Sequence, residues 1–569
     1  MTYQHFKHEG WLYLLAFAIA FTLRFAQLGD MPLSDAEAAP ALQALRISQS
    51  AATELAPHPF YILATSILFL LFGGGTNTLA RIIPALIGSL LVLTPLLFDN
   101  RIKPRPSLLL AFFIALDPGL VAISRQAASP ILAIVFTVLT VGFINKNRFT
   151  WAAVTAAFAL LSGPSLWLGL LGIGIAYSIY QLAHTVIKKT VDHSEESDVP
   201  TTNLSASLFT PSNGLTLVFT FLLAGTLFFI VPGGLGAAFS SIPAFVNSWF
   251  DLSATTSSMV LISLLVYQPF ALLLALIALI RGWVKGLRRI IFLSIWLLVA
   301  LLLVIFLPAR QIADLAWVLI PLNALASLEL VRHLKVFPEE RREVAGVTFL
   351  TVFIWLFAWL GMAGINWFPT DSSEFRLRIG ILIGAVFLLV LSLLLVAAGW
   401  SIRVARIGGV WGMAVGLGLL GLSGLFGASG MRGVIFPELW WQPELPLQAD
   451  LLRETVSQVS EMGTGNDDTA SVVIVGINSP ALEWALRENP VQMVNTLDPT
   501  SAPDMVITSF ELNPTLVSAY RGQDFNWRQT PAWQATTPDA WFRWVTLREM
   551  PQTGEVIILW ARSDLFLDN

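Results

Sequence analysis

Long apolar runs separated by short polar loops make up most of the chain. A membrane-spanning helix needs roughly 20 mainly apolar residues, and about thirteen runs approach that length. They lie at 11–28, 82–98, 107–123, 130–144, 150–163, 165–183, 214–232, 257–280, 290–307, 313–331, 345–365, 377–399 and 409–428. The pattern predicts a polytopic α-helical membrane protein with about thirteen transmembrane helices.

One further apolar run, Pro59 to Gly73, is short and ends in three glycines. Whether it crosses the membrane decides the sidedness of everything that follows. If it lies along the outer leaflet, most basic clusters and every Lys fall in inner loops, as the positive-inside rule requires. This reading predicts a cytoplasmic N-terminus, an extracytoplasmic C-terminus and residence in the bacterial plasma membrane.

Beyond Gly430 the composition becomes that of a soluble domain, so we expect a transmembrane domain over 1–430 and an extracytoplasmic domain over 431–569. Apolar β-branched runs at 471–477, 504–509 and 555–561 predict strands, and 480–488 predicts a helix. The second domain is therefore expected to be α/β. Its single Gly476 gives no phosphate-cradling glycine pattern.

Composition excludes several classes of protein. With 55% hydrophobic and 12% charged residues the chain is no ordinary soluble protein, and a net charge of -4 does not indicate a nucleic-acid partner. The absence of Cys excludes disulfides and thiol catalysis. The six His are scattered without zinc-ligand spacing, so we predict no metal-ligand residues.

The first polar segment, Gly29 to Pro59, carries two carboxylates, Asp35 and Glu37, where the chain leaves the membrane. A charge beside a low-dielectric medium is costly, so acidic residues there often serve a function. We read this segment as the rim of an outward-facing active site. A structural alternative stays open: Ser34 or Asp35 caps a helix that runs to Arg46, with acidic residues in its first turn.

Four stretches carry a family resemblance: LRFAQLGDMPLSDAEAAPALQALRI, HPFY, FGGGTNTLARIIPALIGSLLVL and PGLVAISR. They resemble membrane glycosyltransferases of the GT-C class, in particular bacterial relatives of protein mannosyltransferases and aminoarabinose transferases. The resemblance implies transfer of a sugar from a polyprenyl-phosphate carrier to a glycan, lipid or protein acceptor. Over the later two thirds it rests on layout alone.

The resemblance also implies roles for individual residues. Asp35 and Glu37 would be catalytic, because a carboxylate can take the proton of an acceptor hydroxyl. Arg125 and Arg310 would hold the phosphate through bidentate contacts. His58 and Asp314 complete the predicted substrate-binding set.

The chain departs from the family pattern at two places. The family's adjacent Asp-Glu pair falls on Ala36 and Glu37, and no carboxylate follows Ser124-Arg125. Metal binding by paired outer loops, which some relatives use, is therefore not the expectation here, and the presence of a divalent metal stays open. Two other functions stay open: a catalytically degenerate relative that binds lipid-linked sugar or assists cell-envelope glycan assembly, and a transporter.

Overall fold

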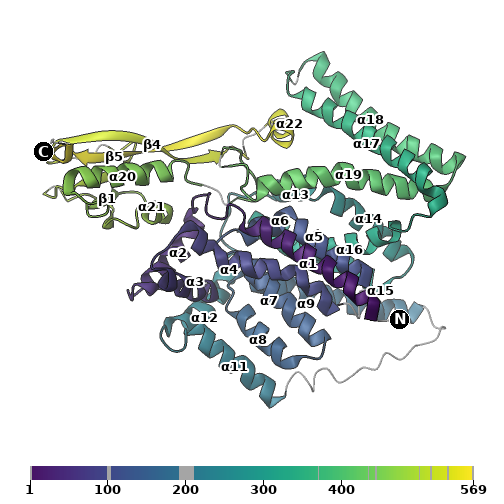
Figure 1. Ribbon diagram of the computed structural model, residues 1–569, viewed down its shortest axis with the longest axis horizontal. Helices are drawn as coiled ribbons and strands as arrows, with labels where there is room; N and C mark the ends of the chain where they lie inside the picture. Colours follow the sequence, from purple (N-terminus) through teal and green to yellow (C-terminus); the bar gives the residue numbers. More distant parts are fainter. Residues whose placement is uncertain are drawn as a thin grey trace.

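A computed structural model describes residues 3–98, 104–190, 210–369, 371–433, 435–441, 445–498, 500–512, 516–534 and 537–566. A large bundle of helices carries a small sheet domain at one end (Figure 1). The first half of the bundle contains α1 (Tyr3–Phe25), α2 (Asp35–Ser48), α3 (Pro59–Phe72), α4 (Asn77–Leu90), η1 (Leu91–Phe98), α5 (Pro104–Leu116), α6 (Pro118–Ser124), α7 (Ile131–Asn145), α8 (Phe149–Leu160) and α9 (Ser165–Thr190). The second half contains α11 (Pro211–Gly225), α12 (Gly233–Asn247), α13 (Ser257–Tyr267), α14 (Pro269–Val284), α15 (Arg288–Phe306), η2 (Ile312–Leu315), α16 (Ala316–Leu330), η3 (Val331–His333), η4 (Pro338–Glu340), α17 (Arg341–Ile365), α18 (Ser373–Gly399) and α19 (Ile402–Ala428).

The apolar runs of the sequence do form helices, and the polytopic α-helical fold is confirmed. Among the described residues, seven helices are long and apolar enough to cross a membrane, or up to nine if each of two bent pairs is one span. Each of the thirteen predicted spans falls on one of these or on a shorter apolar helix. The count of thirteen is not confirmed, because helices such as Ile131–Asn145 and Phe149–Leu160 are shorter than a full span.

Both bent pairs break at a proline inside an apolar stretch. The axis turns by 58° between α5 and α6 and by 94° between α13 and α14. Pro118 and Pro269 follow the two breaks, as expected for a residue that cannot donate a helical hydrogen bond. Asp117 caps α6 by accepting the Leu120 N–H at 2.9 Å, and its other oxygen accepts the Asn323 amide of α16 at 2.7 Å.

The C-terminal domain is a five-stranded sheet with strand order β2-β1-β3-β5-β4. Its elements are α20 (Ala449–Thr464), β1 (Val472–Val475), α21 (Pro480–Ala485), β2 (Val491–Val494), β3 (Met505–Ser509), β4 (Tyr520–Pro531), α22 (Pro538–Leu547), β5 (Gln552–Arg562) and η5 (Ser563–Phe566). β1 runs parallel to β2 and β3, whereas β5 runs antiparallel to β3 and β4. The α/β expectation is confirmed.

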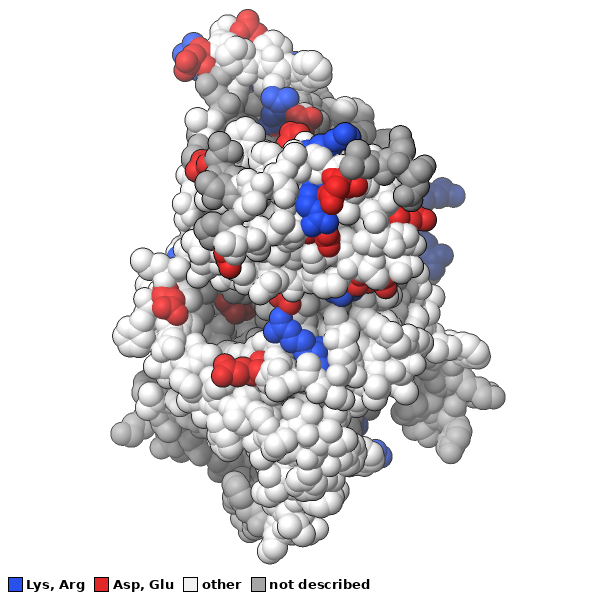
Figure 2. Space-filling model, turned by 90° about the vertical axis from the view of Figure 1, so that its left-hand side faces the viewer, with Lys and Arg blue, Asp and Glu red and all other residues white. Residues whose placement is uncertain are grey.

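The two ends of the bundle differ in charge. Helix α19 begins near Arg403 and ends at Ala428, from where the chain continues to the sheet domain. We call the end of the bundle at Ala428 the domain end. At the opposite end, buried Glu329 binds Arg281 and Arg332, each at 2.8 Å, and Arg403 reaches the Lys335 carbonyl. On the face that carries the sheet domain, charged side chains gather over that domain and along its border with the helices (Figure 2).

Candidate active site

Glu37 lies in the first turn of α2 and is 2% exposed. Ser34 caps the helix, and the Glu37 carboxylate accepts the Ser34 N–H in return, which confirms the capping alternative for this residue. The carboxylate also forms a two-point ion pair with Arg81, Nε to Oε1 at 2.9 Å and Nη2 to Oε2 at 2.8 Å. The Ala127 N–H donates to Oε1 at 2.9 Å. Glu37 thus connects α2, α4 and the segment that follows α6.

Arg81 was not among the site residues predicted from the sequence. Its side chain lies in the first half of α4 and is 4% exposed. Besides Glu37, it donates to the carbonyls of Leu28, Met31 and Pro32, so it holds the segment between α1 and α2 in place. The signal in the sequence is an arginine inside an apolar helix, which needs a buried partner. The first-loop carboxylates were the available partners.

Arg125 ends α6 and contacts the end of α1. Its Nη1 donates to the carbonyls of Leu23, Arg24 and Ala26, and Nη2 donates to Gln27 at 3.0 Å. A cation that binds the last carbonyls of a helix also stabilises the helix dipole. Two of the four carbonyls belong to the last turn of α1 and two follow it, so the Arg125 contacts hold the end of this helix in place.

Two neighbouring cavities lie at the domain end. The smaller, about 30 Å³, is lined by Glu37, Arg81 and Arg125. The larger, about 450 Å³, lies between the bundle and the sheet domain and is lined by residues at the starts of α13 and η2, by residues 437–441 together with Leu445, and by residues of β4. Gln126, Trp441 and Leu445 line both cavities. The buried carboxylate is therefore close to a space large enough for a sugar-sized group.

Arg310 lies beside the larger cavity. Its Nη1 donates to the Thr255 carbonyl at 3.2 Å, and both Thr255 and Gln311 line that cavity. Its buried Nε has no hydrogen-bond partner within the described part of the chain. Asp314 instead accepts the Gln311 N–H at 2.9 Å and so caps η2. Arg310 thus carries a buried donor without a described partner next to this cavity, while the cavity itself is lined by its neighbours Thr255 and Gln311.

Asp35 points away from Glu37 and contacts the sheet domain. Its Oδ1 accepts the Ser479 hydroxyl at 2.7 Å and the Ala481 N–H at 2.9 Å, both at the start of α21. Its Oδ2 binds Arg528 of β4. Nearby, Arg46 pairs with Glu483. These contacts attach α2 to the sheet domain, and a catalytic role for Asp35 stays a prediction.

His58 lies apart from both cavities. It precedes α3, and its Nδ1 is 3.4 Å from the Ser162 carbonyl, beside Gly163. The structure therefore brings Glu37, Arg81 and Arg125 together, places Arg310 by the adjoining cavity, and leaves Asp35 and His58 outside. Among the described residues, no three His, Asp or Glu side chains are grouped so as to hold a metal ion.

Gly119 positions one wall of the larger cavity. A Cβ added there would meet the Trp440 ring at 2.4 Å, and Trp440 in turn accepts the Gln126 amide at its carbonyl at 2.6 Å. We expect Gly119→Ala to destabilise the protein by roughly 1–2 kcal/mol through overpacking, and to displace Trp440. Thermal unfolding in detergent measures the loss of stability, and Trp fluorescence reports the displacement of Trp440. Gly10→Ala, at a glycine with open space around it, serves as control, and an equal effect there would contradict the packing argument.

Comparison of the sequence with protein-family models and with curated proteins finds no match. Solved structures do match. ArnT from Cupriavidus metallidurans bound to undecaprenyl phosphate is 14% identical, with a TM-score of 0.58 over 98% of this chain and 99% of that chain. The apo form of the same protein gives a TM-score of 0.50 over 88% of this chain and 93% of that chain, again at 14% identity. An oligosaccharyltransferase from Archaeoglobus fulgidus, in complex with zinc and sulfate, gives 0.41 at 12% identity, over 88% of this chain and 68% of that chain. With helices and sheet domain matched over nearly its full length, the chain has the membrane glycosyltransferase fold of the GT-C class.

Proposed function

We propose that the protein is a membrane glycosyltransferase that moves a sugar from a polyprenyl-phosphate donor to an acceptor at the domain end of the bundle. The observation that carries this proposal is the buried Glu37–Arg81–Arg125 cluster, which adjoins the cavity of about 450 Å³ between the bundle and the sheet domain. The full-length match to ArnT bound to undecaprenyl phosphate supports the choice of donor class.

The reaction needs few groups from the protein. The acceptor hydroxyl attacks the anomeric carbon of the donor sugar, the bond from that carbon to the phosphate oxygen breaks, and polyprenyl phosphate leaves with the electron pair. Glu37 is the proposed acceptor of the hydroxyl proton, which requires that it release one of its present donors on binding. Arg310, with its free Nε, is the proposed contact for charge that develops on the phosphate, and Asp314 holds the turn that carries it. Arg125 would add positive potential beside the smaller cavity.

The orientation follows from the same proposal. Basic residues at the end opposite the sheet domain, including Arg281, Arg332 and Arg403, favour a cytoplasmic position for that end. The sheet domain, and with it the cavity, would then face away from the cytoplasm in a bacterial plasma membrane.

The test is sugar transfer by the full-length protein in proteoliposomes supplied with polyprenyl-phosphate sugars. We expect Arg310→Gln to lower kcat/KM about tenfold, the effect of one charge-assisted hydrogen bond. Arg376→Gln, an exposed residue of α18, is the matched control. Transfer that survives unchanged in Arg310→Gln would remove the phosphate assignment, and absence of transfer from every donor would remove the proposed activity.

One observation favours a second function. Both first-loop carboxylates are engaged in ion pairs, Asp35 with Arg528 and Glu37 with Arg81, so neither is an unoccupied base. A catalytically degenerate relative that binds lipid-linked sugar fits that pattern. It predicts saturable donor binding without release of polyprenyl phosphate, measured in the same proteoliposomes.

A further inference from the structure

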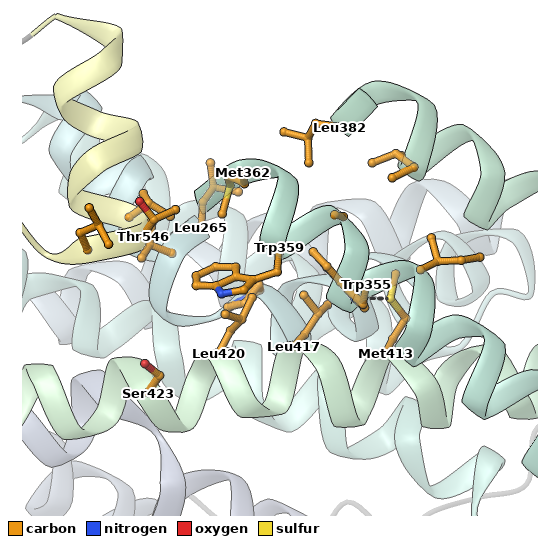
Figure 3. Close-up of a pocket in the computed structure, with 18 of the residues that line it drawn as sticks. Leu265, Trp355, Trp359, Met362, Leu382, Met413, Leu417, Leu420, Ser423 and Thr546 are labelled. Carbon is orange, nitrogen blue, oxygen red and sulfur yellow. Dashed lines mark hydrogen bonds between the residues drawn. The ribbon is translucent and has the colours of Figure 1, made fainter. Parts of the chain in front are cut away.

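A further large cavity, of about 700 Å³, is lined by none of the residues of the Glu37–Arg81–Arg125 cluster. It is enclosed by the α17–α18 hairpin, the later half of α19, the bend between α13 and α14, and α22. Its walls are mostly apolar, and in Figure 3 Trp355 and Trp359 of α17 face Met413, Leu417 and Leu420 of α19. Its lining is that of a site for a hydrocarbon chain.

The domain end of this cavity is basic. Arg432 and Arg548 both line it, and both lie near the same buried carboxylate of Glu438, at 3.7 Å and 3.6 Å. Tyr267 donates its hydroxyl to that carboxylate as well. Two guanidinium groups against one carboxylate leave an excess of positive charge where the apolar walls end.

Arg548 has an unused donor. Its side chain is stacked on Trp544, with 4.7 Å to the ring centroid, and the residue is only 8% exposed. Its Nη1 nevertheless has no hydrogen-bond partner among the described residues. A buried donor without an acceptor is costly, and here it lines a cavity in which a ligand oxygen can satisfy it.

One wall of the cavity, α18, lies on the outer surface of the bundle. Only 11% of the most apolar window of α18 is buried inside the protein, and Arg432 keeps 29% of its side chain exposed. Pro437 and Glu438 line the cavity of about 450 Å³ beside Arg310, whereas Phe436 lines the cavity of about 700 Å³. The segment from Phe436 to Glu438 thus separates the two spaces.

We propose that this cavity binds one anionic glycerophospholipid, with its phosphodiester on Arg432 and Arg548 and an acyl chain between α17, α18 and α19. Charge complementarity selects the occupant: a phosphodiester carries a single negative charge, which matches the excess positive charge of the cluster. A zwitterionic lipid would bring its own cation toward the arginines, and inorganic phosphate would leave the apolar walls empty. The proposal is independent of the sugar-transfer activity.

Native mass spectrometry of the full-length protein tests the proposal. Protein released from nanodiscs of equal parts phosphatidylglycerol and phosphatidylcholine should retain one phosphatidylglycerol. Arg432→Gln, at a partly exposed residue whose loss spares the buried core, should lower that retention about tenfold. Ala385→Phe, which fills the cavity, should lower it as much. Arg403→Gln, at an arginine of the opposite end that also pairs with a glutamate, should change nothing.

Several outcomes would overturn the proposal. Equal retention of the two lipids would remove the charge argument, and an equal loss in Arg403→Gln would remove the site. A loss in Arg432→Gln but not in Ala385→Phe would leave a headgroup contact without a chain in the cavity. Displacement of phosphatidylglycerol by added polyprenyl phosphate, one for one, would assign the cavity to a lipid carrier instead.

Discussion

Arg81→Met is expected to destabilise the protein by about 3–5 kcal/mol, because it leaves the Glu37 carboxylate buried without its cation. Glu37 is 2% exposed, and Arg81 supplies two of its hydrogen bonds. The loss should be visible in denaturant unfolding in detergent. Arg46→Met, which breaks the exposed Arg46–Glu483 pair, should cost less than about 1 kcal/mol.

A double variant separates stability from chemistry at this pair. Glu37→Met combined with Arg81→Met removes both charges, and a buried pair replaced by apolar residues of similar volume is often tolerated. The double variant should therefore be more stable than Arg81→Met alone. If Glu37 takes the proton of the acceptor hydroxyl, the double variant should not transfer sugar even though it is folded. A double variant that transfers sugar normally would show that the pair is structural only.

Asp35→Asn is expected to weaken the contact between the sheet domain and the bundle, lowering the free energy needed to separate them by about 2–3 kcal/mol. The substitution keeps an acceptor for Ser479 and Ala481 but removes the charge that binds Arg528, and hydrogen bonds to charged groups contribute more than neutral ones. Hydrogen exchange should accelerate in α21 and β4, while α7 and α8 stay unchanged.

Glu483→Gln is the matched control for Asp35→Asn. It alters the other ion pair between α2 and α21, whose arginine is 45% exposed, so its effect on exchange should be small. If Asp35 were the catalytic base instead, Asp35→Asn would abolish sugar transfer with no faster exchange in α21 or β4. That result would restore the prediction made from the sequence.

The architecture could be predicted from the sequence because it depends on patterns that repeat along the chain. Twenty-residue apolar runs give helices wherever a backbone must satisfy its own hydrogen bonds in lipid. The strands β1 and β3 could be predicted because their apolar runs are buried, and β5 because every second residue of its apolar run is buried. The edge strands β2 and β4 were missed, because β2 is only four residues long and not buried, and β4 consists mostly of polar residues.

The site could be predicted only in part because side-chain partners come from distant segments. The sequence indicates that Glu37 and Arg125 lie at one end of the bundle, but it does not show that Arg81 is the partner of Glu37, 44 residues away. Nor does it show that Asp35, two residues before Glu37, contacts Arg528 instead, 493 residues away. Two residues along a helix point in directions about 200° apart, so Asp35 and Glu37 leave α2 on nearly opposite sides, one toward the sheet domain and one toward the buried cluster.

The polar contacts at the helix breaks bear on how the chain enters the membrane during synthesis. Asp117 and its broken helix are unfavourable in a bilayer on their own, because Leu120 satisfies only one carboxylate oxygen and lipid offers no donor for the other. The partner that the structure supplies, Asn323, is 206 residues further along the chain. We therefore expect α5 and α6 to reach their native bend only after α16 has been inserted. More than half of the protein must then be synthesised before this early segment adopts its native conformation.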